Sequence, residues 1–244
     1  MLIRRGKGDL PKIYRPFTIS EVYGQKQAKD LIRNGLEKGS LPNNLVFYGA
    51  SGTGKTTCAR IVAIGLSCEK GMTSTPCCEC DSCYGVISGR GIFALNEYNA
   101  AYFTGIDHMR GVVSMFNTPP IGFDRQVIIF DECHRLSKEA QTLLLKVIED
   151  GIPGSYFILC STDSEKILEP LLNRCLPVEF KELSNEEIWK LLVDVCWLEN
   201  IEYHVETLED IVAKSGGKPR NALYLLQKAF MTLTQPKLAQ SAAA

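Results

Sequence analysis

Two hydrophobic patterns alternate along the first three quarters of the chain. Short apolar runs, as in buried strands, are separated by segments whose apolar residues recur at helical spacing. The strand-like runs are 44–50, 92–98, 127–130, 156–160 and 177–180, and helical patterns begin at residue 55, at residue 107 and after Ser137, which fits an N-cap. Strands separated by helices predict an α/β fold, in which a parallel sheet carries helices on both faces.

The pattern changes after residue 183. Ser184 and Glu187 have the spacing of a capping box, and only helical periodicity follows, broken at two turn signals, Asn200 and Gly216-Gly217. We therefore predict an α/β domain at 1–182, a small all-helical domain at 183–235 and a tail at 236–244. The expected core of the helical domain includes three aromatic residues at helical spacing, Trp189, Trp197 and Phe230.

Composition and charge limit the possible functions. The chain is 45% hydrophobic and 23% charged, as in ordinary globular proteins, and its net charge is −1 with a pI near 6.3. It therefore has no general attraction for a polyanion, and any nucleic-acid contact must come from a local patch or from partners. No apolar run approaches the roughly 18–20 residues that span a bilayer, and the first residues lack the apolar core of a secretory signal. We expect a cytoplasmic protein.

A phosphate-binding loop is predicted at 49–56, where GASGTGKT matches G-x-x-x-x-G-K-[ST] between a strand and a helix. Its three glycines, Gly49, Gly52 and Gly54, allow the backbone N–H groups to face phosphate oxygens at a helix N-terminus. Lys55 is expected to reach the β and γ phosphates, and the Thr56 hydroxyl to ligate Mg²⁺. The other predicted nucleotide contacts from this segment are Ser51, Thr53 and Thr57. The alternative is an ordinary glycine-rich turn before a helix.

Two adjacent carboxylates follow the apolar strand at 127–130. Asp131 is placed to hold the Mg²⁺ shell, and Glu132 is suited to orient and polarise an attacking water. The carboxyl end of a strand is also where open α/β sheets bind their ligands. The pair alone could be a loop start, but together with the upstream loop it predicts a P-loop NTPase.

Half of the ten cysteines lie in one short segment. Cys68, Cys77, Cys80 and Cys83 have the spacing of four thiolate ligands for a closed, tetrahedral structural Zn²⁺ site, in an insert at about 68–83. An iron–sulfur cluster, a redox pair and plain thiols are the alternatives. Cys78 is a fifth cysteine that such a site does not need and that could compete as a ligand.

These motifs together resemble the AAA+ ATPases of sliding-clamp loaders, and most of all the gamma/tau subunit of bacterial DNA polymerase III in a short, phage-type form. The resemblance runs from about Tyr14 to Ala229. Besides the loop, the acid pair and the cysteine insert, it rests on YRP (14–16), VYGQ (22–25), NEYNAA (96–101), TGIDHMR (104–110), FDECHRLSKEAQTLLLKVIED (130–150), FILCSTDSEKI (157–167), NRC (173–175) and GGKPRNAL (216–223).

The resemblance implies further site residues. Thr162 would be the sensor 1 hydroxyl, Arg174 an arginine finger that acts on ATP held by a neighbouring subunit, and Arg220 the sensor 2 arginine of a helical lid. The adenine pocket would be bordered by Tyr14, Arg15, Val22 and Tyr23. DNA contacts are suggested by analogy at two positions, Thr104 and Arg110.

The implied activity is ATP hydrolysis, with ATP, Mg²⁺ and Zn²⁺ bound, that releases a sliding clamp onto primer–template DNA in a bacterial or phage-infected cell. The implied partners are the other loader subunits, the clamp and the DNA. Two departures stand out, because Asn173 replaces the usual serine before Arg174 and Asn99 replaces the usual acid after the second strand. The collar domain that follows the lid in the bacterial subunit is not in this sequence, so either a truncated chain or a phage-type subunit is expected.

Two other functions fit part of the pattern. One is another AAA+ ATPase acting on DNA, in branch migration or recombination, against which the cysteine insert argues. The other is a structural loader subunit that binds partners without hydrolysing ATP, against which the intact loop and acid pair argue. Of the three histidines, His134 follows the acid pair and has two interpretations, a polar residue at a helix start, which we favour, and a partner of the acids. His108 and His204 are interpreted as surface positions.

Overall fold

The computed structural model describes residues 2–5, 7–88, 95–102, 106–116 and 125–233, and it divides into two compact units. Unit 2, here the α/β unit, is Pro16–Lys181. Unit 1, here the helical unit, combines Met1–Arg15 with Glu182–Ala244. Each unit has its own set of buried side chains, and the two are described separately below.

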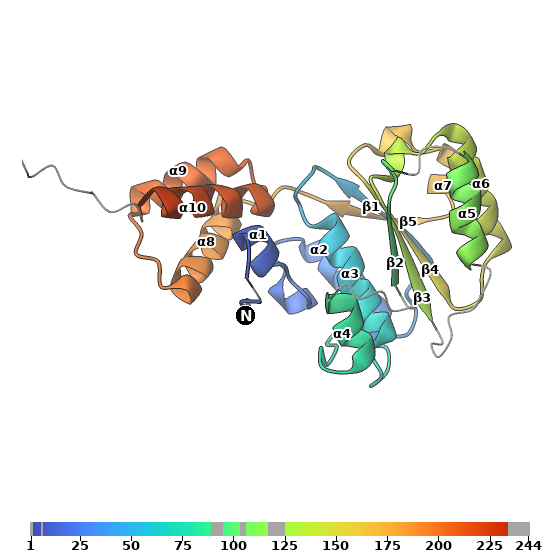
Figure 1. Ribbon diagram of the computed structural model, residues 1–244, viewed down its shortest axis with the longest axis horizontal. Coiled ribbons are helices and arrows are strands. Elements are labelled where there is room, and N and C mark those ends of the chain that lie inside the picture. Colours follow the sequence, from blue (N-terminus) through green and yellow to red (C-terminus); the bar gives the residue numbers. More distant parts are fainter. Residues whose placement is uncertain (1, 6, 89–94, 103–105, 117–124, 234–244) are drawn as a thin grey trace, which may run out of the picture. The chain divides into compact units, whose positions relative to one another are not determined.

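A five-stranded sheet forms the centre of the α/β unit (Figure 1). Its strands are β1 (Asn44–Gly49), β2 (Leu95–Asn99), β3 (Gln126–Asp131), β4 (Ser155–Ser161) and β5 (Leu176–Phe180). They lie in the order β2-β3-β4-β1-β5 and every neighbouring pair is parallel, which confirms the predicted fold class. The predicted second strand began at residue 92, but 92–94 lie outside the described residues.

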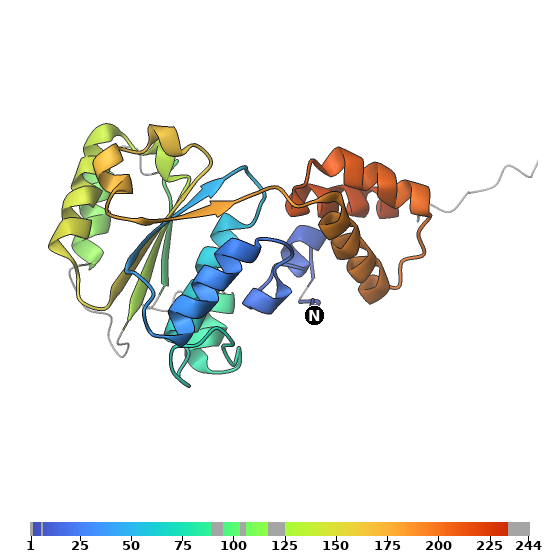
Figure 2. The ribbon, with the colours of Figure 1, turned by 180° about the vertical axis from the view of Figure 1, so that it is seen from behind.

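Helices cover both faces of this sheet (Figures 1 and 2). One face carries α2 (Lys26–Glu37), α3 (Lys55–Ser67) and α4 (Asp81–Ser88), and the other carries α5 (Ile106–Phe116), α6 (Lys138–Asp150) and α7 (Glu169–Leu172). Side chains alternate between the two cores along each strand, so Leu45 and Phe47 of β1 enter the α3 side and Val46 the α6 side. Three short 3₁₀ turns complete the unit: η1 (Ile19–Glu21), η2 (Cys133–Arg135) and η3 (Ser164–Lys166). Helix α4 lies in the cysteine-rich insert, where the sequence predicted no element.

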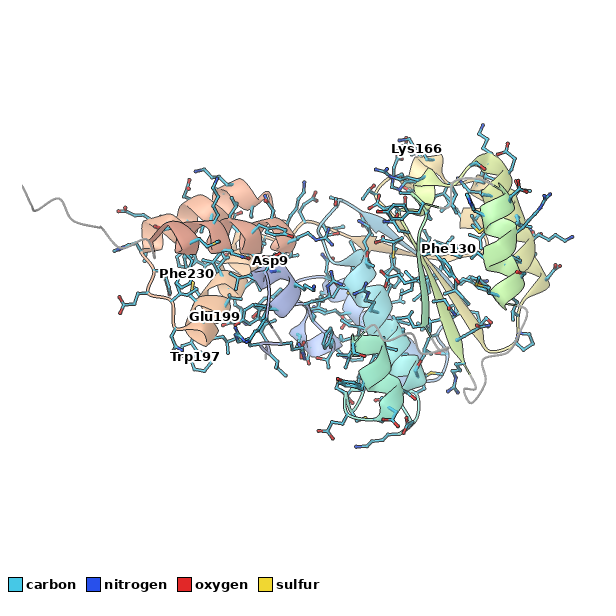
Figure 3. The ribbon with its side chains drawn as sticks, in the orientation of Figure 1. Asp9, Phe130, Lys166, Trp197, Glu199 and Phe230 are labelled. Atoms are coloured by element: carbon cyan, nitrogen blue, oxygen red, sulfur yellow. The ribbon has the colours of Figure 1, made fainter. Side chains whose placement is uncertain are left out.

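The helical unit contains α8 (Asn185–Glu199), α9 (Val205–Ser215), α10 (Pro219–Leu233) and the short α1 (Leu10–Ile13). The predicted capping box is present, because Glu187 N donates to Ser184 Oγ at 3.2 Å and Ser184 N donates to Glu187 Oε2 at 2.9 Å. The core assignment was wrong for Trp197 on α8 and for Phe230 on α10, whose side chains are 67% and 37% exposed (Figure 3). Trp189 is partly buried. The predicted tail, 236–244, lies outside the described residues.

The N-terminal segment packs with the helical unit, whereas the sequence boundary assigned it to the α/β domain. Its buried residues are Leu2, Leu10, Ile13 and Tyr14. Leu10 N donates to Gln227 Oε1 of α10 at 2.8 Å, and the Tyr14 hydroxyl donates to Glu199 Oε1 at the end of α8 at 2.5 Å (Figure 3). Arg4 adds an ion pair of 2.7 Å to Glu199. These contacts join segments about 200 residues apart in the chain, so local sequence patterns could not reveal them.

One buried amide fixes the approach of α6 to the segment after β4. Gln141 is 2% exposed, and its Nε2 donates to the carbonyl oxygens of Leu136 and Lys166, both at 3.1 Å. Its Oε1 accepts from the N–H of Leu168 at 2.8 Å. The side chain thus satisfies three backbone groups that the loops leave without other helical or sheet partners.

No helix in the described ranges is long and apolar enough to cross a membrane.

Gln141→Leu keeps the size of this side chain but removes all three hydrogen bonds. We expect a loss of about 2–4 kcal/mol in the free energy of unfolding, because buried backbone groups would lose their partners. Urea unfolding followed by circular dichroism measures this. Thr142→Ala, at the neighbouring exposed position, is the control and should change stability by less than about 0.5 kcal/mol. A Gln141→Leu protein as stable as wild type would contradict the role of this amide.

Candidate functional site

The predicted phosphate-binding loop joins β1 to α3, and two of its glycines are required by the backbone. Gly49 has φ +136°, and a Cβ there would lie 2.0 Å from the carbonyl oxygen of Phe180 in β5. Gly54 has φ +108° and is the N-cap of α3. No other residue adopts these angles at low cost, and at Gly49 no side chain fits beside the neighbouring strand.

The loop encloses the amino group of Lys55. This side chain is 6% exposed, and its Nζ donates to the carbonyl oxygens of Gly49 and Ala50, both at 2.8 Å. The Thr53 hydroxyl donates to the same Ala50 oxygen at 2.8 Å and tightens the turn. The ammonium group is thereby held at the N-terminal end of α3, where the helix dipole also favours an anion. Of the other predicted contacts from this segment, Ser51 is exposed and Thr57 is half-buried.

The structure brings the two predicted Mg²⁺ ligands together, although they are 75 positions apart in the chain. Thr56 Oγ1 donates to Asp131 Oδ2 at 3.0 Å, from the first turn of α3 to the end of β3. Burial raises the pKa of Asp131, and the negative charge of Glu132 adds to this effect, while the hydrogen bond from Thr56 opposes it. A hydroxyl and a partly buried carboxylate side by side are ligands that a hard divalent cation prefers.

An ion pair beside these ligands was not predicted. Arg60, one turn along α3 from Thr56, donates to both carboxylate oxygens of Glu97 in β2, at 2.6 and 2.8 Å. The pair is partly buried, and the bonds to Glu97 raise the already high pKa of Arg60. Bidentate pairs of this kind are geometrically specific, so it links the P-loop helix to the edge strand of the sheet. No local sequence pattern reveals this pairing, because the two residues lie 37 positions apart.

Gln25, in the VYGQ segment, was also missed. It has a left-handed backbone (φ 51°) and is the N-cap of α2. Its amide pairs with the backbone of Lys181, donating to the carbonyl oxygen at 2.6 Å and accepting from the N–H at 3.2 Å. The same Nε2 lies 3.4 Å from the carbonyl oxygen of Thr53 in the loop. This side chain therefore connects the P-loop to the residue that follows β5.

Glu132 lies next to Asp131 and has a left-handed backbone conformation, with φ 55°. Its N–H donates to Asp131 Oδ1 at 3.1 Å, and its Oε2 lies 3.3 Å from His134 Nε2. His134 Nδ1 lies 3.3 Å from the hydroxyl of Ser161, the last residue of β4. The contact with Glu132 supports the second interpretation of His134, as a partner of the acids, over the favoured one of a polar residue at a helix start.

The arginines carried over from the family lie on different units. Arg174 follows α7 in the α/β unit, is about half exposed, and forms an ion pair of 2.7 Å with Glu149 of α6. Arg220 is exposed in the first turn of α10 of the helical unit. Thr162 follows β4 directly and is half-buried. Of the suggested DNA contacts, Arg110 forms an exposed pair with Asp107 on α5, and Thr104 lies outside the described residues.

The four residues predicted to border adenine are divided between the two units. Tyr14 and Arg15 belong to the helical unit, where burial and the Glu199 hydrogen bond raise the pKa of Tyr14. Val22 and Tyr23 follow η1 in the α/β unit, and Val22 is buried. Their role in nucleotide binding stays a prediction.

The four predicted metal ligands converge at one point. The Sγ atoms of Cys68, Cys77, Cys80 and Cys83 all lie within 4.8 Å of one another, with 3.7 Å between Cys68 and Cys77 and 4.0 Å between Cys77 and Cys83. A tetrahedral ion with bonds of roughly 2.3 Å to sulfur separates its ligands by about 3.8 Å, so the group fits a Zn²⁺ ion.

The surroundings of the cluster favour a thiolate at Cys77 and a neutral thiol at Cys83. Cys80 N donates to Cys77 Sγ at 3.4 Å, and Cys83 N donates to Cys80 Sγ at 3.5 Å. Hydrogen bonds from the N–H groups of Glu79 and Cys80 lower the pKa of Cys77 to about 6, whereas burial raises that of Cys83. Cys78 is not part of the group, because its thiol donates to the carbonyl oxygen of Pro76 at 3.6 Å.

Comparison with known proteins identifies similar sequences. A family model described as DNA polymerase III, delta subunit, matches residues 24–184. The chain is 35% identical to the DNA polymerase III subunit gamma of Buchnera aphidicola subsp. Baizongia pistaciae, over 90% of this chain and 59% of that protein. It is 34% identical to the subunit tau of Escherichia coli K12 and 31% identical to that of Bacillus subtilis 168, over 90% of this chain in each case and 34% and 39% of those proteins. The chain thus spans less than two thirds of the length of these relatives.

Solved structures show the same fold at lower identity. The RuvB Holliday junction branch migration motor of Thermotoga maritima superposes with a TM-score of 0.68 at 23% identity, covering 90% of this chain and 66% of that one. A variant of the same motor gives 0.67 at 21% identity, with the same coverage. Together with the parallel sheet and the helical C-terminal region, this confirms the predicted AAA+ fold.

Gly49→Ala should destabilise the protein, because its Cβ would collide with the carbonyl oxygen of Phe180 and L residues rarely adopt φ +136°. We expect a loss of about 2–3 kcal/mol, seen as a fall of roughly 5–10 °C in Tm by scanning calorimetry. The control is the same substitution at Gly111 in α5, where a Cβ meets nothing within 4 Å. Gly111→Ala should stabilise by about 0.5–1 kcal/mol, and equal effects at the two positions would contradict this account.

Proposed function

The chain belongs to the family described as DNA polymerase III, delta subunit, as a gamma/tau-like AAA+ protein, and we propose that it is an ATP-hydrolysing subunit of a sliding-clamp loader. The observation that carries the hydrolytic part of this proposal is the contact of Thr56 with Asp131, directly beside Glu132. A phosphate loop, a cation site and a water-orienting carboxylate then lie at one edge of one sheet. These are the parts that hydrolysis of a γ-phosphate needs.

Each residue has a distinct role in the proposed reaction. Lys55 and the loop N–H groups bind and orient the β and γ phosphates. Thr56 and Asp131 hold Mg²⁺, which supplies charge neutralisation for the phosphate oxygens when it is bound. Glu132 orients the attacking water and accepts its proton, while Thr162 reports on the γ-phosphate.

The remaining roles depend on assembly. Arg174 is exposed enough to reach another molecule, and its guanidinium would stabilise charge on the phosphoryl group of ATP held by a neighbouring subunit. Glu149, which pairs with Arg174, would hold it ready at the surface. Arg220 would sense the nucleotide from the helical unit. Primer–template DNA and the clamp would align the finger, and hydrolysis would release the clamp on DNA.

The proposal has a clear competitor in a structural subunit that does not hydrolyse ATP. The site favours hydrolysis over a purely structural role, since the loop encloses Lys55 and Thr56 is paired with Asp131. Partial burial of the Asp131 carboxylate is unfavourable, and a subunit that does not hydrolyse ATP would have no use for it. Branch migration gains no support from the Thermotoga structures, since their identity to this chain is below 25% and supports the fold alone.

We also propose that the cysteine insert is a structural Zn²⁺ site. Four thiolates leave no open position for catalysis, and the cluster joins the end of α3 to α4. Glu69 tightens the insert by accepting from both Ser82 N and Ser82 Oγ, at 3.1 and 3.0 Å. The ion would replace the apolar core that so short a segment lacks.

Subunit mixing tests the ATPase proposal. Glu132→Gln should bind ATP and lose about 100-fold or more of the hydrolysis that primed DNA and clamp stimulate, and Arg174→Ala should lose the stimulation too. An equal mixture of the two should regain part of the rate, because the Glu132→Gln chain supplies the finger to the intact site of the Arg174→Ala chain. The measurement is phosphate release.

Glu165→Gln, at an exposed position, is the control and should hydrolyse ATP like wild type. A rate that Glu132→Gln leaves unchanged would contradict the ATPase role. A mixture no faster than its components would contradict the finger in trans. A wild-type rate indifferent to clamp and DNA would contradict the loader role.

Metal analysis tests the cysteine site. The purified chain should contain about one zinc ion, released by thiol modification, and Cys80→Ser should lose the zinc and lower the Tm by on the order of 5–10 °C. Cys78→Ser should keep both the metal and the stability, since Cys78 lies outside the ligand group. Iron in place of zinc, or zinc retained by Cys80→Ser, would contradict the assignment.

A further inference from the structure

The imidazole of His134 lies between Glu132 and Ser161. Its Nε2 is 3.3 Å from Glu132 Oε2 and its Nδ1 is 3.3 Å from Ser161 Oγ. The side chain is only 11% exposed, whereas His108 and His204 are both exposed. It reaches Ser161 because η2 follows β3 directly and β3 is paired with β4. The ring therefore has a fixed partner on each side, one of them the proposed water-orienting acid.

The hydroxyl of Ser161 is fixed beside the ring by its own hydrogen bonds. It donates to the carbonyl oxygen of Asp163 at 2.8 Å, and it accepts from the N–H of Asp163 at 3.0 Å. These bonds hold the hydroxyl 3.3 Å from Nδ1 of His134, while the other ring nitrogen, Nε2, faces Glu132.

The backbone of Glu132 is also constrained. A non-glycine residue with φ 55° is uncommon, and its N–H is bonded to Asp131 Oδ1. The left-handed backbone thus sets the direction in which the Glu132 side chain leaves the chain, and His134 contacts its carboxylate. Among the charged groups near His134, Asp163 is itself paired with Lys166 at 2.8 Å, which leaves Glu132 as the partner in direct contact with the ring.

We propose that His134 is a positioning residue for Glu132, anchored in turn by Ser161. The ring holds the carboxylate in the one orientation from which it directs the attacking water, and it contacts neither nucleotide nor cation itself. This inference rests on the proposed function, in which Glu132 orients that water. If the role is correct, removing the ring lowers kcat and leaves the affinity for ATP unchanged, because only the geometry of the chemical step changes.

Kinetics of the full chain with clamp and primed DNA test this role. His134→Phe keeps a ring but no nitrogen, and we expect kcat to fall about 10- to 100-fold with the Kd for ATP within about two-fold of wild type. His134→Gln retains an N–H donor for Glu132 and should recover part of that loss. Ser161→Ala should lower kcat about 3- to 10-fold, since the ring stays but loses its anchor. His204→Phe, at an exposed position of the helical unit, is the control and should behave as wild type.

A second measurement does not depend on turnover. The chain has three histidines, so long-range ¹H–¹⁵N spectra can resolve each ring, with His134→Gln to assign the signals. We expect the His134 signals to shift in Ser161→Ala while those of His108 and His204 stay in place, because only His134 lies beside Ser161.

The outcomes separate the inference from the function on which it rests. Wild-type kcat in His134→Phe, a loss that appears in the Kd for ATP instead of kcat, or His134 signals that Ser161→Ala leaves unchanged would each overturn the positioning role. Hydrolysis that does not depend on Glu132 would overturn the proposed function, and the positioning role with it. The expected kinetic pattern together with the shifted His134 signals would support both.

Discussion

Parallel pairing of the sheet is the constraint on which the rest of the site depends. Because all four strand pairs are parallel, the carboxyl ends of β1, β3 and β4 meet at one edge. The P-loop leaves β1 there, Asp131 ends β3 and Ser161 ends β4. The contact between Thr56 and Asp131 follows from this register, and it connects the start of the P-loop helix to the neighbouring half of the sheet. A slip of one residue in β3 would turn Asp131 to the opposite face and remove the proposed cation site.

The charged groups at this edge leave the carboxylate of Asp131 available for a cation. Glu97 is neutralised by Arg60, and Glu132 lies against His134. Asp131 receives hydrogen bonds from neutral donors, the Thr56 hydroxyl and the N–H of Glu132, while burial and the charge of Glu132 raise its pKa. A partly buried carboxylate with neutral donors gains most from a cation. The electrostatics of the edge therefore agree with a divalent ion at Asp131 and with a separate, oriented acid at Glu132.

The two units are stabilised in different ways. The α/β unit buries continuous apolar strands between two helical layers, and its buried amide at Gln141 satisfies backbone groups that the loops leave open. Its insert has few apolar residues and is organised by four converging thiols instead. The helical unit completes its core with the N-terminal segment, through Leu10, Tyr14 and the shared partner Glu199. Mutations in these three regions should therefore act through different physical mechanisms.

The sequence by itself determined the features that depend on neighbouring residues. The hydrophobic period predicted the strands and helices, the spacing of Gly49 to Thr56 predicted the loop, and the two C-x₂-C steps predicted the cluster of four cysteines, because each is encoded in a short window. Tertiary structure alone decided the strand order, the placement of the N-terminal segment on the helical unit, the pairing of Arg60 with Glu97 and the contact of His134 with Glu132 and Ser161. These features join residues from separate strands and helices, and the partner of a charged or polar side chain is set by the register of the sheet, which no local pattern contains.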